Sequence, residues 1–155
     1  MTEIASLLAP GAVTAGGHMA NAKALFQHLG QVAEREYGLA AIDVVDRLTE
    51  RERLGSTGFG GGVAIPHGKM EGLDHVVGIF VQLATPVDVK AIDDLPVDLV
   101  FCLLSPPDAG SEHLKALAQV SRWLRDRTFV AKLRGAGSAD AIYALFAASQ
   151  TRDAA

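Results

Sequence analysis

Residues 97–105, VDLVFCLLS, form a nearly continuous apolar run of the length of one β-strand, which Pro106-Pro107 closes. A strand with one face in water alternates polar and apolar residues, whereas an unbroken apolar run is typical of a central strand that is covered on both faces. We therefore expect this segment at the centre of a sheet with helices on both sides. Cys102, the only cysteine of the chain, lies within the run. We expect it to be a small buried side chain, and a disulfide framework or a CxxC metal site is excluded.

Two further segments, GGVAI at 61–65 and HVVGIFVQL at 75–83, are rich in β-forming residues. We interpret ATPVDVKAIDDLP, residues 84–96, as a loop that leads into the central strand. Near the N-terminus we expect a short helix that Pro10-Gly11 ends, followed by a brief strand that begins at Val13.

Segments in which apolar residues recur at helical spacing lie before and after this strand-rich centre. Before it, residues 24–33 indicate a helix that Gly38 stops, and residues 41–53 indicate another. After it, one helix begins near Ser111 and a last one is capped by Ser138. The side chains expected to face the core are Ile4, Leu7 and Leu8 on the short first helix, Ile42, Val45 and Leu48 on residues 41–53, Leu114, Leu117, Ala118, Ser121 and Leu124 after Ser111, and Ile142, Leu145 and Phe146 on the last helix.

This order of elements predicts an α/β fold, an α+β sandwich in which a mixed parallel and antiparallel sheet has helices on both faces. The chain has 155 residues, of which 49% are hydrophobic and 21% charged. These values suit a compact protein rather than a disordered one. We therefore expect a single domain over residues 1–155, without a linker.

The ends and the charge of the chain exclude several classes of protein. Glu3 stands where a secretion signal carries basic residues, and no apolar run approaches the roughly 20 residues that span a bilayer. We therefore expect a cytoplasmic protein with no membrane insertion. The net charge of −4 does not suit a general nucleic-acid binder. Arg122, Arg125 and Arg127 form a basic cluster, but Asp126 interrupts it, as on a solvated helix face.

The stretch GSTGFGGGVAIPHGK, residues 55–69, resembles a nucleotide-binding loop only in its glycines. A dinucleotide fingerprint that starts at Gly58 needs a third glycine where the chain has Val63. A P-loop that ends at Gly68-Lys69 needs a serine or threonine where the chain has Met70. The run also leads into a strand, so it offers no helix N-terminus to a phosphate. A bound nucleotide is therefore not expected.

The same stretch holds one histidine at a defined place. Pro66 restricts Ile65 to an extended conformation and fixes its own φ, so it sets the position of His67. Gly68 and the glycines before it let other groups approach, and we expect them to clear the surroundings of the imidazole. We therefore interpret His67 as functional rather than as a surface histidine in a turn.

The other histidines divide into structural and functional candidates. His18 and His28 lie in or near a helix, where a structural role is expected. His75 and His67 are a conceivable metal pair that lacks a third ligand. His113 falls in the first turn of a helix, where the helix dipole disfavours a protonated ring and free amides lie near. A neutral imidazole N–H there suits a phosphoryl group.

The stretch from Gly55 to Lys69 resembles the active-site segment of enzyme IIA proteins of the bacterial phosphoenolpyruvate phosphotransferase system. Within the fructose and mannitol class it is most similar to the nitrogen-regulatory branch. The resemblance extends through LTERERLGSTG before the stretch and through VGIFVQLATPV, AIDDLPVDLVFCLL and HLKALAQVSRWL after it, and covers roughly residues 20–148. One departure is Gly60-Gly61-Gly62, where relatives commonly have a polar residue in the middle.

The resemblance implies a phosphotransferase with a phosphohistidine intermediate and without metal, nucleotide or other cofactor. His67 matches the histidine that is transiently phosphorylated, at Nε2, by a small histidine phosphocarrier protein. His113 matches a second active-site histidine, and Arg51 matches an arginine of the motif before the loop. We expect the backbone amides of Thr57 and Gly58 to assist, and a shallow apolar docking patch formed by Phe59, Ile65 and Met70.

Three functions agree with this resemblance. The first is a nitrogen-related phosphoryl carrier whose phosphorylation state controls target proteins, such as regulators of potassium transport, nitrogen metabolism or the stringent response. The second is a sugar-specific IIA component that passes phosphate to a IIB domain for fructose-type or mannitol-type uptake. The third is a regulatory binding module without phosphotransfer. The chain ends soon after its last helix with no fused IIB domain, which favours the first, and the presence of His67 and His113 argues against the third.

Overall fold

The computed structural model describes the backbone of residues 3–154 and the side chains of residues 3–149. Six strands form one mixed sheet in which β1, β5, β6, β3 and β2 are neighbours in that order, and β4 also pairs with β6. The strands are β1 (Leu8–Gly17), β2 (Gly58–Gly60), β3 (Val63–Ala64), β4 (His67–Lys69), β5 (Val77–Val87) and β6 (Val97–Ser105). The helices are α1 (Ile4–Leu7), α2 (Ala22–Tyr37), α3 (Ala41–Arg53), α4 (Ser111–Arg125), α5 (Arg127–Gly135) and α6 (Ala139–Ala154).

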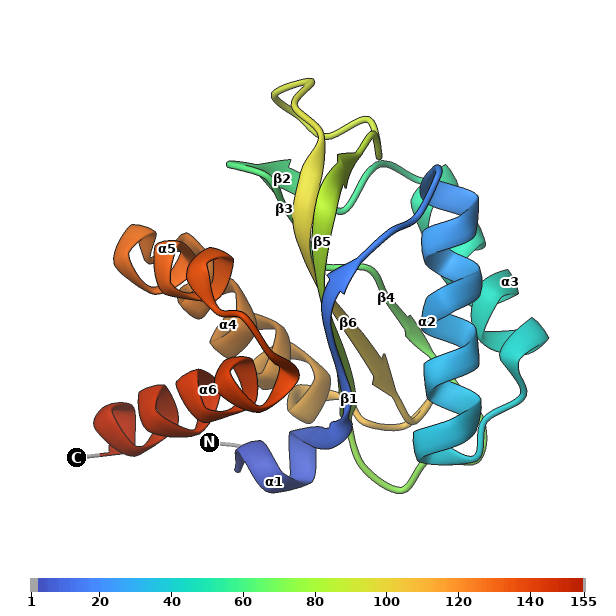
Figure 1. Cartoon of the computed structure of the whole chain (residues 1–155). Helices are drawn as coiled ribbons and strands as arrows, with labels where there is room; N and C mark the ends of the chain where they lie inside the picture. Colours follow the sequence, from blue (N-terminus) through green and yellow to red (C-terminus); the bar gives the residue numbers. More distant parts are fainter. Residues whose placement is uncertain (1–2, 155) are drawn as a thin grey trace.

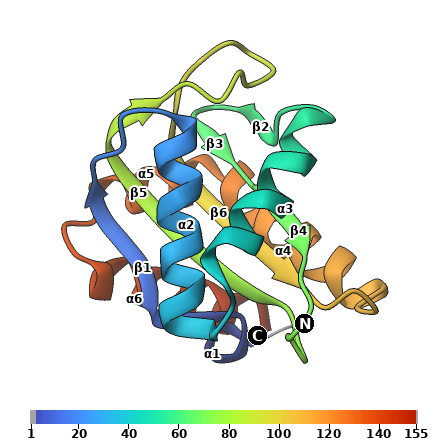
Figure 2. The ribbon, with the colours of Figure 1, turned by 90° about the vertical axis from the view of Figure 1, so that its right-hand side faces the viewer.

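Helices cover both faces of this sheet (Figure 1). The pair α2 and α3 lies on one face, and it stands in front of the strands in the turned view of Figure 2. The helices α4, α5 and α6 lie on the other face. β6 is central and almost wholly buried, and it is antiparallel to β5 but parallel to β3 and β4. The prediction of a mixed sheet between helical layers is therefore confirmed.

The core beside α4, α5 and α6 is aromatic. Phe146 of α6 packs against four other rings, with centroids 5.1 to 5.5 Å away. Its neighbours are Phe80, Phe101, Trp123 and Phe129. Ile142 and Phe146 are fully buried, as their helical spacing predicts. Aromatic contacts of this kind join the last helix to the central strands.

Several predicted strand boundaries are wrong: the strand expected at 61–65 is only Val63–Ala64, and the larger errors concern β1 and the end of β5. β1 begins at Leu8 and runs through Pro10-Gly11, because an edge strand tolerates proline and the register with β5 shifts between Leu8 and Val13. β5 continues to Val87, which is buried and pairs with Val97, so residues 84–87 belong to the strand and not to the loop.

Some predicted inward faces are also wrong. Ile42 is 71% exposed and Leu114 is 66% exposed, whereas Val44 and Trp123 are buried on the same two helices. The buried stripe of a helix is set by where the helix lies on the sheet, and an apolar side chain at its first turn can project beyond that contact.

A helix that the sequence did not indicate is α5. The Asp126 side chain accepts a hydrogen bond from the Phe129 amide at 3.1 Å, and it thereby caps the start of this helix. The acidic residue that interrupts the basic cluster therefore separates α4 from α5. In the part of the chain that the structure describes, no helix is both long enough and apolar enough to cross a membrane.

Candidate active site

β3 and β4 follow one another along the same side of β6, and Pro66 lies at the break between them. Val63 pairs with Leu99, and His67 pairs with Leu103. Pro66 has no N–H, but its carbonyl accepts a hydrogen bond from the Leu103 amide at 2.9 Å. His67 is thus held on the central strand by backbone pairing on both sides of the proline.

The His67 ring has a defined orientation. Its Nδ1 lies 2.8 Å from the carbonyl oxygen of Ile65. A carbonyl oxygen only accepts, so Nδ1 carries the hydrogen and donates it. In the neutral ring the lone pair is then on Nε2, which makes Nε2 the nucleophilic atom.

His113 comes from the first turn of α4 and lies next to His67. The centroids of the two rings are 5.6 Å apart. Burial lowers the pKa of His113 below its ordinary value, and electrostatic interactions with a protonated His67 ring and with Lys69 lower it further. His113 is therefore neutral near pH 7 and has one N–H to donate.

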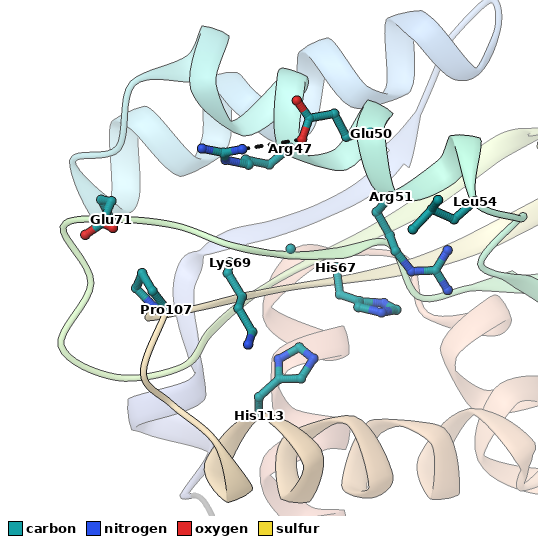
Figure 3. Close-up of a pocket in the computed structure, with 10 residues that line it drawn as sticks. Arg47, Glu50, Arg51, Leu54, His67, Lys69, Glu71, Pro107 and His113 are labelled. Atoms are coloured by element: carbon teal, nitrogen blue, oxygen red, sulfur yellow. Dashed lines mark hydrogen bonds and ion pairs between the residues drawn. The ribbon is translucent and has the colours of Figure 1, made fainter.

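The two histidines lie in an open pocket of about 480 Å³ (Figure 3). Its other lining residues are Arg47, Glu50, Arg51, Leu54, Gly68, Lys69, Glu71 and Pro107. Arg51 extends beside the His67 ring, and its guanidinium donates one hydrogen bond to the Gly55 carbonyl at 2.9 Å. The lining contains three cationic side chains and two carboxylates. Arg47 and Glu50 form an ion pair at 3.4 Å. The pocket is therefore suited to an anion.

The structure does not place Thr57 or Gly58 in this pocket. The Thr57 amide and hydroxyl both donate to the Glu52 carboxylate, and the Gly58 amide donates to the Ser56 hydroxyl at 3.1 Å. Both amides are thus used within the loop and not directed at His67. Side chains nearby in the sequence accept hydrogen bonds from the two amides that we expected to face a phosphoryl group.

The three apolar residues expected to form a docking patch are also elsewhere. Ile65 and Met70 lie just before and just after residues 66–69, and both side chains are buried in the hydrophobic core. Phe59 lies under the guanidinium of Arg125, 5.6 Å from it, in a separate pocket. Ile65 still contributes to the site through the carbonyl that binds His67.

The glycine run forms the turn between β2 and β3 instead of clearing space around His67. Gly60, Gly61 and Gly62 have φ angles of +102°, +69° and +81°, a region that suits glycine. A Cβ on Gly62 would lie 2.5 Å from Nη2 of Arg134, which donates to the Gly61 carbonyl at 2.6 Å. Arg134 also pairs with Asp98 at 2.8 Å. The glycines therefore allow a tight hairpin that Arg134 holds to the start of β6.

Several residues at the site were missed in the sequence, among them Lys69 and Ser105. Lys69 lies in the glycine-histidine stretch and lines the same pocket as both rings, but no role was assigned to it. Ser105 ends the apolar run of β6, and its hydroxyl lies 2.5 Å from Nδ1 of His113. A lone polar residue at the end of a buried strand was the available signal.

The metal pair that His67 and His75 could have formed is not present, because His75 is not near His67. The His75 ring binds Asp74 and the Ser6 carbonyl.

The family model of the phosphoenolpyruvate-dependent sugar phosphotransferase system, EIIA 2, matches residues 6–149. The chain belongs to this EIIA type 2 family. It is therefore a phosphoryl carrier of the phosphotransferase type, and the resemblance seen in the sequence is confirmed.

Several EIIA relatives are nitrogen regulatory proteins. One from Bradyrhizobium diazoefficiens is 43% identical over 144 residues, which cover 93% of this chain and 94% of the relative. One from Escherichia coli is 41% identical over 127 residues, which cover 81% of this chain and 78% of the relative. The crystal structure of IIA-Ntr from Neisseria meningitidis has a TM-score of 0.86 at 36% identity, over 92% of this chain and 97% of that one. The IIA mannitol structure from Escherichia coli, at 21% identity and a TM-score of 0.72 over 87% of this chain and 95% of that one, shares the fold.

We expect this EIIA protein to lose stability as the pH falls below about 6.5. Burial lowers the pKa of His113 and of His28, so the folded chain binds protons at these rings less readily than the unfolded chain does. The free energy of unfolding is therefore highest when the pH is above the pKa that these two histidines have in the unfolded chain. It decreases as the pH falls toward their lower pKa in the folded chain. Urea midpoints at about pH 7.5 and about pH 5.5 measure the difference.

Replacement of a single histidine tests whether the lowered pKa values cause this pH dependence. His28→Asn removes a shifted histidine outside the pocket, so the pH dependence should become weaker. His18→Asn, at an exposed position, is the control and should keep the wild-type dependence. A midpoint that is unchanged or higher at the lower pH in the wild type would contradict the expectation.

Proposed function

We propose that the protein accepts a phosphoryl group on Nε2 of His67 from the phosphohistidine of a histidine phosphocarrier protein, and that its phosphorylation state controls regulatory partners. The observation that carries this proposal is the hydrogen bond from His67 Nδ1 to the Ile65 carbonyl. It leaves Nε2 as the free nucleophile in a pocket with more cationic than anionic side chains. No nucleotide, metal or other cofactor is needed, because the donor N–P bond is already reactive.

The transfer balances without any further reactant. The lone pair of His67 Nε2 attacks phosphorus, and the N–P bond of the donor breaks. Its electron pair returns to the donor ring nitrogen, and the donor leaves as a neutral imidazole with its proton on the other nitrogen. The phosphorylated His67 ring keeps the hydrogen on Nδ1, and the Ile65 carbonyl stabilises the positive charge that develops there.

The neighbouring side chains supply electrostatic stabilisation. Phosphoryl transfer spreads negative charge over the three equatorial oxygens, so positioning and nearby donors provide most of the catalysis. Arg51 and Lys69 bring positive charge to the pocket, and His113 brings a neutral N–H. We therefore propose for Arg51 and His113 the roles expected from the sequence, and we add Lys69 to them.

The nitrogen-related role is supported by nitrogen regulatory proteins that align over most of this chain. A nitrogen regulatory protein aligns over 94% of its own length, whereas a fructose-specific EIIA component from Haloferax volcanii, 36% identical, aligns over 67%. We propose one domain over residues 1–155 that acts in the cytoplasm on regulatory proteins of potassium transport, nitrogen metabolism or the stringent response. The continuous core from Ile4 to Phe146 supports the single domain.

The test uses the purified protein with phosphoenolpyruvate, enzyme I and a histidine phosphocarrier protein. We expect the addition of one acid-labile phosphoryl group, measured by intact mass, and its location on Nε2, measured by nitrogen-15 and phosphorus-31 NMR. Omission of the phosphocarrier protein is the control and should prevent the addition. An unmodified mass in the complete mixture would refute the proposal. Efficient onward transfer to a sugar-specific IIB domain would instead support the sugar-transport alternative.

A further inference from the structure

Ser105 stands where the two histidines of the pocket meet the central strand. It is the last residue of β6, lies opposite Lys69 of β4 in the parallel pairing, and is fully buried. Its hydroxyl oxygen lies 2.5 Å from Nδ1 of His113, and the His113 imidazole points toward His67 (Figure 3). The serine thus contacts the second histidine at Nδ1 and does not itself line the pocket.

The direction of this hydrogen bond follows from the donors and acceptors present. A buried hydroxyl that does not donate its hydrogen loses a bond it would make in water. Among the described residues, His113 Nδ1 is the partner recorded for the Ser105 hydroxyl. The hydroxyl therefore donates, and Nδ1 accepts. A neutral imidazole that accepts at Nδ1 carries its hydrogen on Nε2.

We propose that Ser105 is a positioning residue that fixes His113 in the tautomer with hydrogen on Nε2, so that this N–H donates to an oxygen of the phosphoryl group on His67. The inference rests on the proposed function. Phosphoryl oxygens only accept hydrogen bonds, so the opposite tautomer would direct a lone pair at an anion. Ser105 itself touches no reacting atom, and His113 transmits its effect.

The tautomer can be read in the unphosphorylated protein. Long-range proton–nitrogen NMR spectra distinguish the two neutral tautomers of His113 from the shifts of its ring nitrogens. We expect hydrogen on Nε2 in the wild type and a mixture of tautomers in Ser105→Ala. Ser149→Ala, at another buried serine that does not line the pocket, is the control and should keep the wild-type spectrum. Hydrogen on Nδ1 of His113 in the wild type would overturn the inference.

Transfer rates then test whether the tautomer matters for the reaction. We expect Ser105→Ala to slow phosphoryl transfer to His67 about two- to tenfold, the effect of one lost hydrogen bond. The same substitution in a His113→Ala background should have no effect on the rate, because the residue through which Ser105 acts is absent. Equal slowing in both backgrounds would show a general structural effect and would overturn the inference.

The outcomes also separate this inference from the proposed function. If the wild type accepts phosphate and Ser105→Ala transfers at the wild-type rate, the role of Ser105 is wrong and the proposed function stands. If the wild type accepts no phosphate from any donor, the proposed function is wrong and so is the donation to a phosphoryl oxygen. The NMR comparison still decides in that case whether Ser105 sets the tautomer of His113.

Discussion

His67→Ala is expected to take up no phosphate from the phosphocarrier protein. The substitution removes the Nε2 atom that we propose as the nucleophile, and the pocket offers no equivalent at the same point. His113 is the other ring in the pocket, but it comes from α4 and its Nδ1 is engaged by Ser105. Intact mass after incubation with phosphoenolpyruvate and the donor system measures the loss, which should be complete.

A matched substitution shows whether the loss is specific. His75→Ala removes a histidine whose ring contacts Asp74 and the Ser6 carbonyl, outside the pocket, so it should accept phosphate at the wild-type rate. His113→Ala should still accept one phosphoryl group on His67, but more slowly. Persistence of the acid-labile group in His67→Ala would reject His67 as the acceptor. Circular dichroism of each variant confirms that the fold is retained.

Phe146→Ala is expected to produce the largest loss of stability, about 3–5 kcal/mol in the free energy of unfolding. The Phe146 ring is fully buried, and no smaller side chain can fill the space between the rings that surround it. Single domains are commonly stable by about 5–15 kcal/mol, so this loss is a large part of the total. Urea unfolding followed by tryptophan fluorescence measures this loss, since the ring centroids of Trp123 and Phe146 are 5.3 Å apart.

An exposed apolar residue provides the control for this substitution. Ile42 is on α3 and largely in water, so Ile42→Ala should change the free energy of unfolding by no more than about 0.5 kcal/mol. A Phe146→Ala protein as stable as Ile42→Ala would mean that α6 does not depend on the aromatic cluster. Folded Phe146→Ala should still accept phosphate, because Phe146 does not line the pocket.

Local sequence predicted the elements whose residues interact with near neighbours in the chain. Gly38 ends α2 with a φ of +70°, as a glycine after a helix commonly does. Ser138 caps α6 by accepting from the Ala141 amide at 3.1 Å. β1 could not be predicted in full, because its passage through Pro10 depends on pairing with β5, which is far away in the sequence.

The site divides in the same way. His67 could be selected from its flanking residues, and His113 from its place at the start of a helix together with the family resemblance, and the structure brings their rings together. The amides of Thr57 and Gly58 looked available in the sequence, but the Glu52 carboxylate and the Ser56 hydroxyl bind them. Ser105 looked like the end of a buried strand, and only its distance to the His113 ring gives it a role.

The sequence by itself determined the kind of fold and the family, and it singled out the histidine that we propose as the phosphoryl acceptor, since these depend on the apolar run of β6 and on the residues next to His67. The tertiary structure decided which groups surround that histidine. Pairing of β4 with β6 and packing of α4 on the sheet bring His67, Ser105 and His113 together from separate segments. Hydrogen bonds and pKa shifts depend on distances of a few ångströms, and such distances between remote residues exist only once the chain has folded.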